Sequence, residues 1–139
     1  MVIRLAGLFL LLILSGCQGT PQTFAGFTFG GGGNTFNCEP ATWSVNEKGF
    51  QLSSGGSGPT SISLSGSTAL LPGEMAELSQ ASVRVPSQGE QAAQLVSGNL
   101  VLQSQNGAIV HGSFDLLVKL ADGREFPVVG SFTAEHRLP

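Results

Sequence analysis

Three short segments near the C-terminal end share one pattern: a valine, a glycine and then a large apolar residue. They are Val-Ser-Gly-Asn-Leu at 96–100, Val-His-Gly-Ser-Phe at 110–114 and Val-Gly-Ser-Phe at 129–132. The triplets between them, Gln105-Asn106-Gly107 and Ala121-Asp122-Gly123, suit three-residue hairpin loops with glycine in a left-handed third position. The pattern therefore predicts a meander of three antiparallel strands over residues 95–135.

The two loops also predict how these strands pair. In the predicted register a large side chain covers a glycine on the neighbouring strand, which is one way to seal a sheet. The expected pairs are Leu102–Val110, Leu100–Gly112 and Gly98–Phe114 across the first loop, and Val118–Phe126, Leu116–Val128, Phe114–Gly130 and Gly112–Phe132 across the second. Lys119 would meet Glu125 on the outer face, and a slip of one residue would break this pairing.

Alternation along the strands divides the meander into two faces. The face expected to point inward carries Val110, Phe114, Leu116, Val118, Leu120, Phe126, Val128 and Phe132. The outward face is mostly polar, but Leu95, Leu117 and Val129 are expected to lie side by side on it. This apolar spot is a possible partner surface, unless another layer of the protein covers it.

Upstream segments alternate between apolar and polar residues as well, at 41–45, 50–52, 62–70 and 81–85. Residues 74–78 are expected to make one helical turn after Pro72-Gly73. Many short strands with frequent turn signals predict an all-β domain. The expected architecture is a small antiparallel β-sandwich, or alternatively a small up-and-down β-barrel, with the three-stranded meander at its C-terminal end.

The N-terminal region has a different character. Residues 5–14 are almost entirely apolar and follow a short positive start at Arg4. About ten apolar residues are too few to span a bilayer, which needs roughly twenty, but they suit the core of a secretion signal. The next residues complete the sequence Leu14-Ser15-Gly16-Cys17, which resembles the lipobox of bacterial lipoproteins.

This resemblance implies that a signal peptidase cuts before Cys17 and that lipid on Cys17 anchors the mature protein to a membrane. Gln18 follows the cysteine, and the absence of aspartate there favours the outer membrane. The expected organisation is a signal peptide over 1–16, a lipidated N-terminus and tether over 17–33, and an all-β domain over 34–139. The three phenylalanines within 24–29 suggest a first strand or docked segment inside the tether.

Composition and spacing exclude several kinds of chemistry. Without Arg4 the mature chain has five basic and nine acidic residues (6 − 1 and 9), a net charge of −4, and no basic cluster, so nucleic-acid binding is not expected. With Cys17 lipidated, Cys38 has no internal disulfide partner and is expected to be buried, or alternatively paired with a cysteine of another molecule. We find no catalytic motif, no metal-ligand spacing and no phosphate loop, and we expect no enzyme activity, no metal and no cofactor.

One strand carries His111, Ser113 and Asp115 on the same face, as a catalytic triad would require. However, His111 and Asp115 are four residues apart, roughly 13 Å along a strand, which is too far for a hydrogen bond. The expected function is therefore a non-enzymatic envelope lipoprotein, bound to the membrane through Cys17, that binds or scaffolds another envelope protein.

The alternative is a ligand-binding or enzyme-inhibitor β-barrel lipoprotein. Phe36-Asn37-Cys38, with the Ser/Gly-rich loop at 53–59, resembles membrane-bound lysozyme-inhibitor lipoproteins. That resemblance implies a small β-barrel, although the paired cysteines of many such proteins are absent from this chain.

Overall fold

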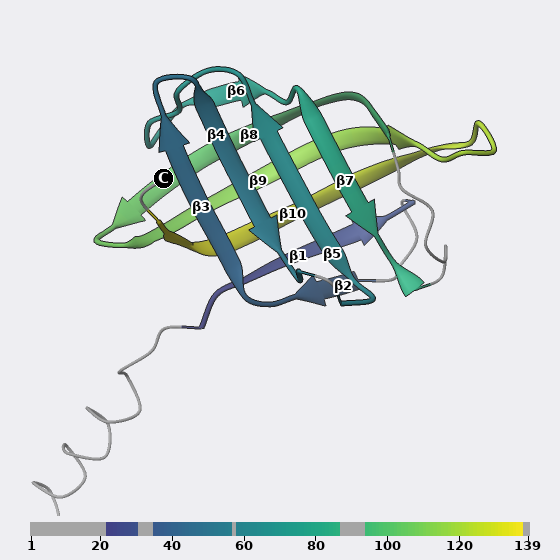
Figure 1. Ribbon diagram of the computed structural model, residues 1–139, viewed down its shortest axis with the longest axis horizontal. Coiled ribbons are helices and arrows are strands. Elements are labelled where there is room, and N and C mark those ends of the chain that lie inside the picture. Colours follow the sequence, from purple (N-terminus) through teal and green to yellow (C-terminus); the bar gives the residue numbers. More distant parts are fainter. Residues whose placement is uncertain (1–21, 31–34, 57, 87–93, 138–139) are drawn as a thin grey trace, which may run out of the picture.

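Ten strands make up most of the computed structural model, which describes residues 22–30, 35–56, 58–86 and 94–137 (Figure 1). In chain order they are β1 (Phe24–Phe29), β2 (Thr35–Cys38), β3 (Ala41–Asn46), β4 (Gly49–Ser54), β5 (Ser61–Gly66), β6 (Met75–Glu77), β7 (Gln80–Arg84), β8 (Gln94–Asn106), β9 (Ile109–Lys119) and β10 (Glu125–His136). The all-β prediction is confirmed. Within these ranges we find no helix of the length and apolarity needed to cross a membrane.

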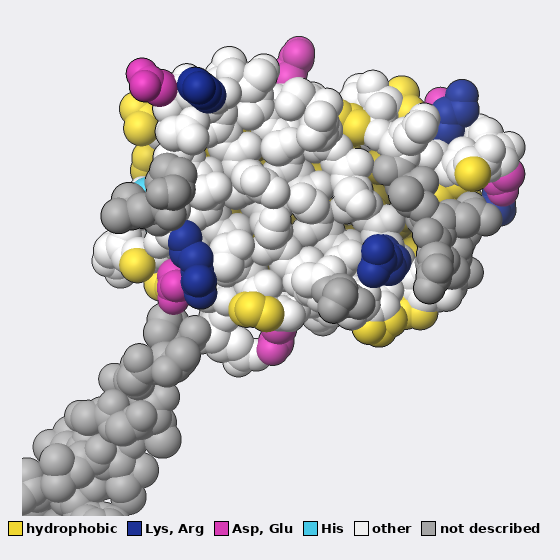
Figure 2. All heavy atoms as spheres, in the orientation of Figure 1, with side chains coloured by type: hydrophobic (Ala, Val, Ile, Leu, Met, Phe, Trp, Pro, Cys, Tyr) yellow, Lys and Arg dark blue, Asp and Glu magenta, His cyan; other side chains and the backbone are white. Residues whose placement is uncertain are grey.

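One strongly curved sheet folds over on itself to give two layers. Its strand order is β6-β8-β9-β10-β3-β4-β5-β7, and β1 pairs with β10 and β2. Figure 1 shows β3, β4, β5 and β7 side by side in a front layer, with β8, β9 and β10 crossing behind them. The outer face of the front layer is turned toward the viewer in Figure 2 and carries few charged or apolar side chains.

The two ends of the curved sheet belong to one stretch of chain, residues 75–84. Its first part, β6, pairs with β8, and the Leu78 amide continues that ladder by donating to Gly98 O at 2.9 Å. The next amide, that of Ser79, donates to Ser65 O at 2.8 Å and starts the ladder between β7 and β5. At the other corner β10 turns from β1 to a short parallel pairing with β3. The fold therefore combines features of the predicted sandwich and of its barrel alternative.

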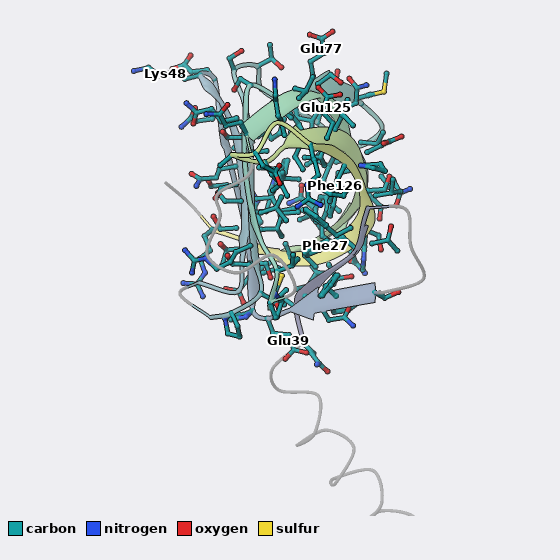
Figure 3. The ribbon with its side chains drawn as sticks, turned by 90° about the vertical axis from the view of Figure 1, so that its right-hand side faces the viewer. Phe27, Glu39, Lys48, Glu77, Glu125 and Phe126 are labelled. Carbon is teal, nitrogen blue, oxygen red and sulfur yellow. The ribbon has the colours of Figure 1, made fainter. Side chains whose placement is uncertain are left out.

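A row of stacked aromatic rings fills the space between the layers. Ring centroids are 5.4 Å apart for Phe50 and Trp43, 5.8 Å for Trp43 and Phe132, and 6.4 Å for Phe132 and Phe114. These four residues come from β4, β3, β10 and β9 and are at most 3% exposed. Figure 3 shows side chains, among them Phe27 and Phe126, filling the interior of the curve. The layers are thus joined by a packed apolar core.

The β9–β10 hairpin has the register predicted from its loop. The structure pairs Phe126 with Val118, Phe132 with Gly112 and Glu125 with Lys119. The predicted inward residues of the meander are buried, apart from the partly buried Phe126. Gly112 needs its lack of a side chain, because a Cβ there would collide with the ring of Phe132.

The predicted β8–β9 register is wrong by two residues. Leu102 pairs with Gly112 and Leu100 with Phe114, whereas Val110 and Gly112 were the expected partners. The hairpin turns at Gly107 and Ala108 instead of at a three-residue loop, and a β-bulge between Leu102 and Ser104 absorbs part of the offset. From Ser97 to Leu102 the shift of two residues keeps each side chain on its predicted face, so the burial of Leu100 and Leu102 was still predicted correctly.

Three predictions for the upstream part of the chain also differ from the structure. The expected helical turn at 74–78 is wrong, because residues 75–77 extend as β6 along β8. The alternation expected to run to residue 70 ends at Gly66, where β5 stops. The domain boundary expected at residue 34 lies too late, because β1 pairs with six residues of β10 and buries Ala25, Phe27 and Phe29.

Candidate functional site

The structure brings together only two of the three residues expected to form an apolar surface spot. Leu117 and Val129 lie on the outer face of the meander, where Pro127 pairs with Leu117 and Asp115 with Val129. Val129 is 47% exposed, whereas Leu117 is half-buried. Leu95 instead packs against the hydrophobic core. A second bulge, between Leu95 and Ser97, explains the difference, because it pairs Leu95 with the buried Val118 instead of with Leu117.

His111, Ser113 and Asp115 share the outer face of β9, as expected. The Nδ1 atom of His111 lies 3.0 Å from the Thr133 hydroxyl, its cross-strand partner on β10. Asp115 pairs instead with Val129, farther along the hairpin. The imidazole is therefore oriented by a hydroxyl and not by the carboxylate. The other histidine, His136, is the last residue of β10 and does not join this group. Its Nδ1 lies 3.3 Å from the Gln105 amide nitrogen.

Cys38 is buried, as the sequence predicted. Its thiol donates to Ala25 O at 3.7 Å, and the Ser54 hydroxyl donates to Cys38 O at 2.8 Å. Burial raises the pKa of the Cys38 thiol above its ordinary value, while hydrogen bonding of the thiol with the Ser54 side chain and the Ile62 backbone opposes that rise. A neutral, shielded thiol is a poor nucleophile and a poor metal ligand.

Neutral polar side chains form two rows across the outer face of the front layer. Each row crosses β3, β4, β5 and β7 through directly paired residues. The rows are Thr42-Ser53-Ser63-Ser82 and Ser44-Gln51-Ser65-Gln80. Arg84 is the one charged residue within these four strands, and it lies at the rim, where it donates to Gly58 O at 3.4 Å. This face accordingly presents hydroxyl and amide groups with little net charge.

A surface groove of about 440 Å³ lies over part of these rows. Besides row residues from β4, β5 and β7, it is lined by Ser79 and Ala81 and by two residues of β8, Gln94 and Leu95. Leu95 thus contributes to a surface feature, but not to the one expected from the sequence. Serines alternate with core residues over 61–65, and this alternation in the sequence indicates a polar outer face on that strand. The sequence did not predict the groove, because β5 pairs with β7 and not with β6, the next strand along the chain.

The remaining site predictions concern residues that the structure describes only in part. Cys17 and the signal peptide lie outside the described residues. Among the residues described, no three His, Cys, Asp or Glu side chains cluster as a metal site would require. Comparison with protein-family models, with curated proteins and with solved structures found no match for this chain.

Proposed function

We propose that this protein is a lipid-anchored component of a bacterial envelope, with a non-enzymatic β domain that binds another envelope component. The lipobox-like sequence Leu14-Ser15-Gly16-Cys17 carries the anchoring part of the proposal. The localisation follows from it, and Gln18 favours the outer membrane. The groove on the front layer supports the binding part, because seven of its lining side chains end in a hydroxyl or an amide that can bond a ligand.

The position of β1 limits how far the domain can move from its proposed anchor. Thr23 is buried, and its hydroxyl accepts a hydrogen bond from the Ala41 amide at 2.9 Å, so the domain begins there. Only residues 18–22 then separate it from Cys17. A fully extended chain spans at most about 3.6 Å per residue, so the six steps from Cys17 to Thr23 reach roughly 20 Å. The domain would therefore work close to the membrane surface.

The packed interior bears on the alternative of a ligand-binding barrel. The stacked rings of Phe50, Trp43, Phe132 and Phe114 occupy the space that an internal ligand would need. A ligand or partner protein would therefore be held on the outside of the sheet.

The anchor is tested by Cys17→Ser in a bacterial expression host fed an alkyne-labelled fatty acid. The wild-type protein should carry the label and sediment with membranes, because two or more acyl chains hold a protein stably. Cys17→Ser should lose the label and be soluble or remain uncleaved. Cys38→Ser is the matched control and should behave as wild type. A wild-type protein that is unlabelled and soluble would rule out the anchor.

A further inference from the structure

The groove over β4, β5 and β7 has the chemistry of a site for a neutral, hydroxyl-rich ligand. Seven of its lining side chains end in a hydroxyl or an amide: Gln51, Ser63, Ser65, Ser79, Gln80, Ser82 and Gln94. Each such group offers both donors and acceptors of hydrogen bonds, as sugar hydroxyls do. We infer that this groove binds a neutral glycan strand. The inference deepens the proposed binding function and rests on it for the ligand's location in the envelope.

Most of the polar groups in the groove are available to a ligand. Among the described residues, groove side chains make two hydrogen bonds to other protein groups. Gln51 Nε2 donates to the Ser53 hydroxyl at 3.3 Å, and the Ser79 hydroxyl donates to Ser65 O at 3.2 Å. The exposed amides of Gln80 and Gln94 are on opposite sides of the seam between β7 and β8, and both face the groove.

The spacing of the rows suits a polymer better than a single small molecule. Neighbouring strands lie about 4.8 Å apart, so Gln51, Ser65 and Gln80 repeat at that interval across the sheet. This step is close to the length of one sugar unit in an extended glycan. Successive sugars of a strand that runs across the layer would therefore meet equivalent groups. Ala81 and Leu95 add an apolar surface for the C–H faces of sugar rings.

The charge of the groove selects among glycans. Recognition of carboxylates or phosphates normally uses arginine or lysine, and neither lines this groove. Arg84, at the rim, is engaged with Gly58 O. The groove should therefore prefer a neutral glycan to an acidic one.

Calorimetric titration of the full-length protein in detergent tests this inference. The probes are the tetrasaccharides of β-1,4-linked N-acetylglucosamine and of β-1,4-linked glucose, with a galacturonic acid tetrasaccharide as the acidic comparison. We expect saturable binding of at least one neutral tetrasaccharide and weaker binding of the acidic one. The double variant Gln80→Ala/Gln94→Ala should lower the affinity about tenfold, as expected for the loss of two hydrogen bonds.

Gln103→Ala is the matched control, because it removes an exposed amide from β8 outside the groove. It should leave the affinity unchanged. The inference is wrong if neither neutral tetrasaccharide binds, if the acidic one binds equally well, or if the double variant binds like wild type. It is also wrong if the double variant changes sedimentation instead of glycan affinity, since the face would then join two copies of the chain. Fatty-acid labelling tests the anchor separately, so the two proposals can fail independently.

Discussion

Gly112 lies on β9 directly under the ring of Phe132, where a Cβ would collide with that ring. Gly112→Val should therefore force the aromatic stack apart and destabilise the domain by about 3 kcal/mol, as overpacked cores do. For a domain of this size 1 kcal/mol shifts the Tm by roughly 4 °C, so the Tm should fall by about 12 °C.

Ser113→Val is the control for this substitution. It places the same side chain one residue later, on the outer face of the same strand, where β-branched residues are well tolerated. Thermal melting followed by circular dichroism compares the two variants. Equal melting temperatures for Gly112→Val and wild type would mean that the aromatic ring does not cover Gly112 in solution.

The buried thiol of Cys38 predicts a loss of stability at high pH. Burial raises its pKa in the folded protein, so the folded chain keeps the thiol protonated where the unfolded chain ionises. The contribution to stability is complete below the ordinary thiol pKa of 9.0 and is lost as the pH rises above it. The chain has no tyrosine whose ionisation would mask this effect.

The measurement is the free energy of unfolding in urea between pH 8 and about pH 10. The wild-type value should fall more steeply over this range than that of Cys38→Ala, which has no thiol to ionise. Parallel pH profiles for the two proteins would show that Cys38 is accessible to water in solution.

β1 is an integral strand of the domain and not part of a tether. Its Phe27 is 1% exposed, lies opposite Gly130 of β10 and packs against Phe36 with ring centroids 5.8 Å apart. Phe27→Ala should cost about 3–5 kcal/mol, as is typical for a buried phenylalanine. Phe24→Ala makes the same change on the same strand at a residue that is 37% exposed.

Phe24→Ala should therefore cost less than about 1 kcal/mol. Urea denaturation of both variants separates the two possibilities. If both phenylalanines could be removed at equally small cost, β1 would only rest against a domain that folds without it, and the tether would be longer than proposed.

The two hairpins of the meander show how far loop chemistry predicts pairing. In the β9–β10 hairpin, Asp122 accepts a hydrogen bond from the Arg124 amide at 3.0 Å and Gly123 has a φ of +90°, so the loop is the one its sequence suggests. In the β8–β9 hairpin, Gly107 has a φ of +64° but stands first in a two-residue turn. A glycine suits either position, so the sequence does not determine the register there.

At the scale of the whole molecule, the sequence predicts which side chains are buried better than it predicts which strands are neighbours. Alternation along 41–45, 50–52 and 81–85 is a local property, and it identified the core positions Trp43, Leu52 and Val83. The groove depends on two features. One is the pairing of β5 with β7, which are separated in the chain by β6. The other is the bulge after Leu95, which pairs Leu95 with Val118 instead of with Leu117. Such features arise from contacts between distant segments and leave no periodic signal in the chain.

The pairing of β1 with β10 also determines when the domain can finish folding. Residues 24–29 find their partners only at 128–133, so β1 has no neighbour on that side until residues 128–133 have been synthesised. At about 5–20 residues per second, the roughly hundred residues in between take on the order of 5–20 s to translate. During that interval the nascent chain lacks its final contacts, and a chain without them can still be threaded through a narrow channel. If the chain is exported as proposed, β10 would then complete the fold on the far side of the membrane.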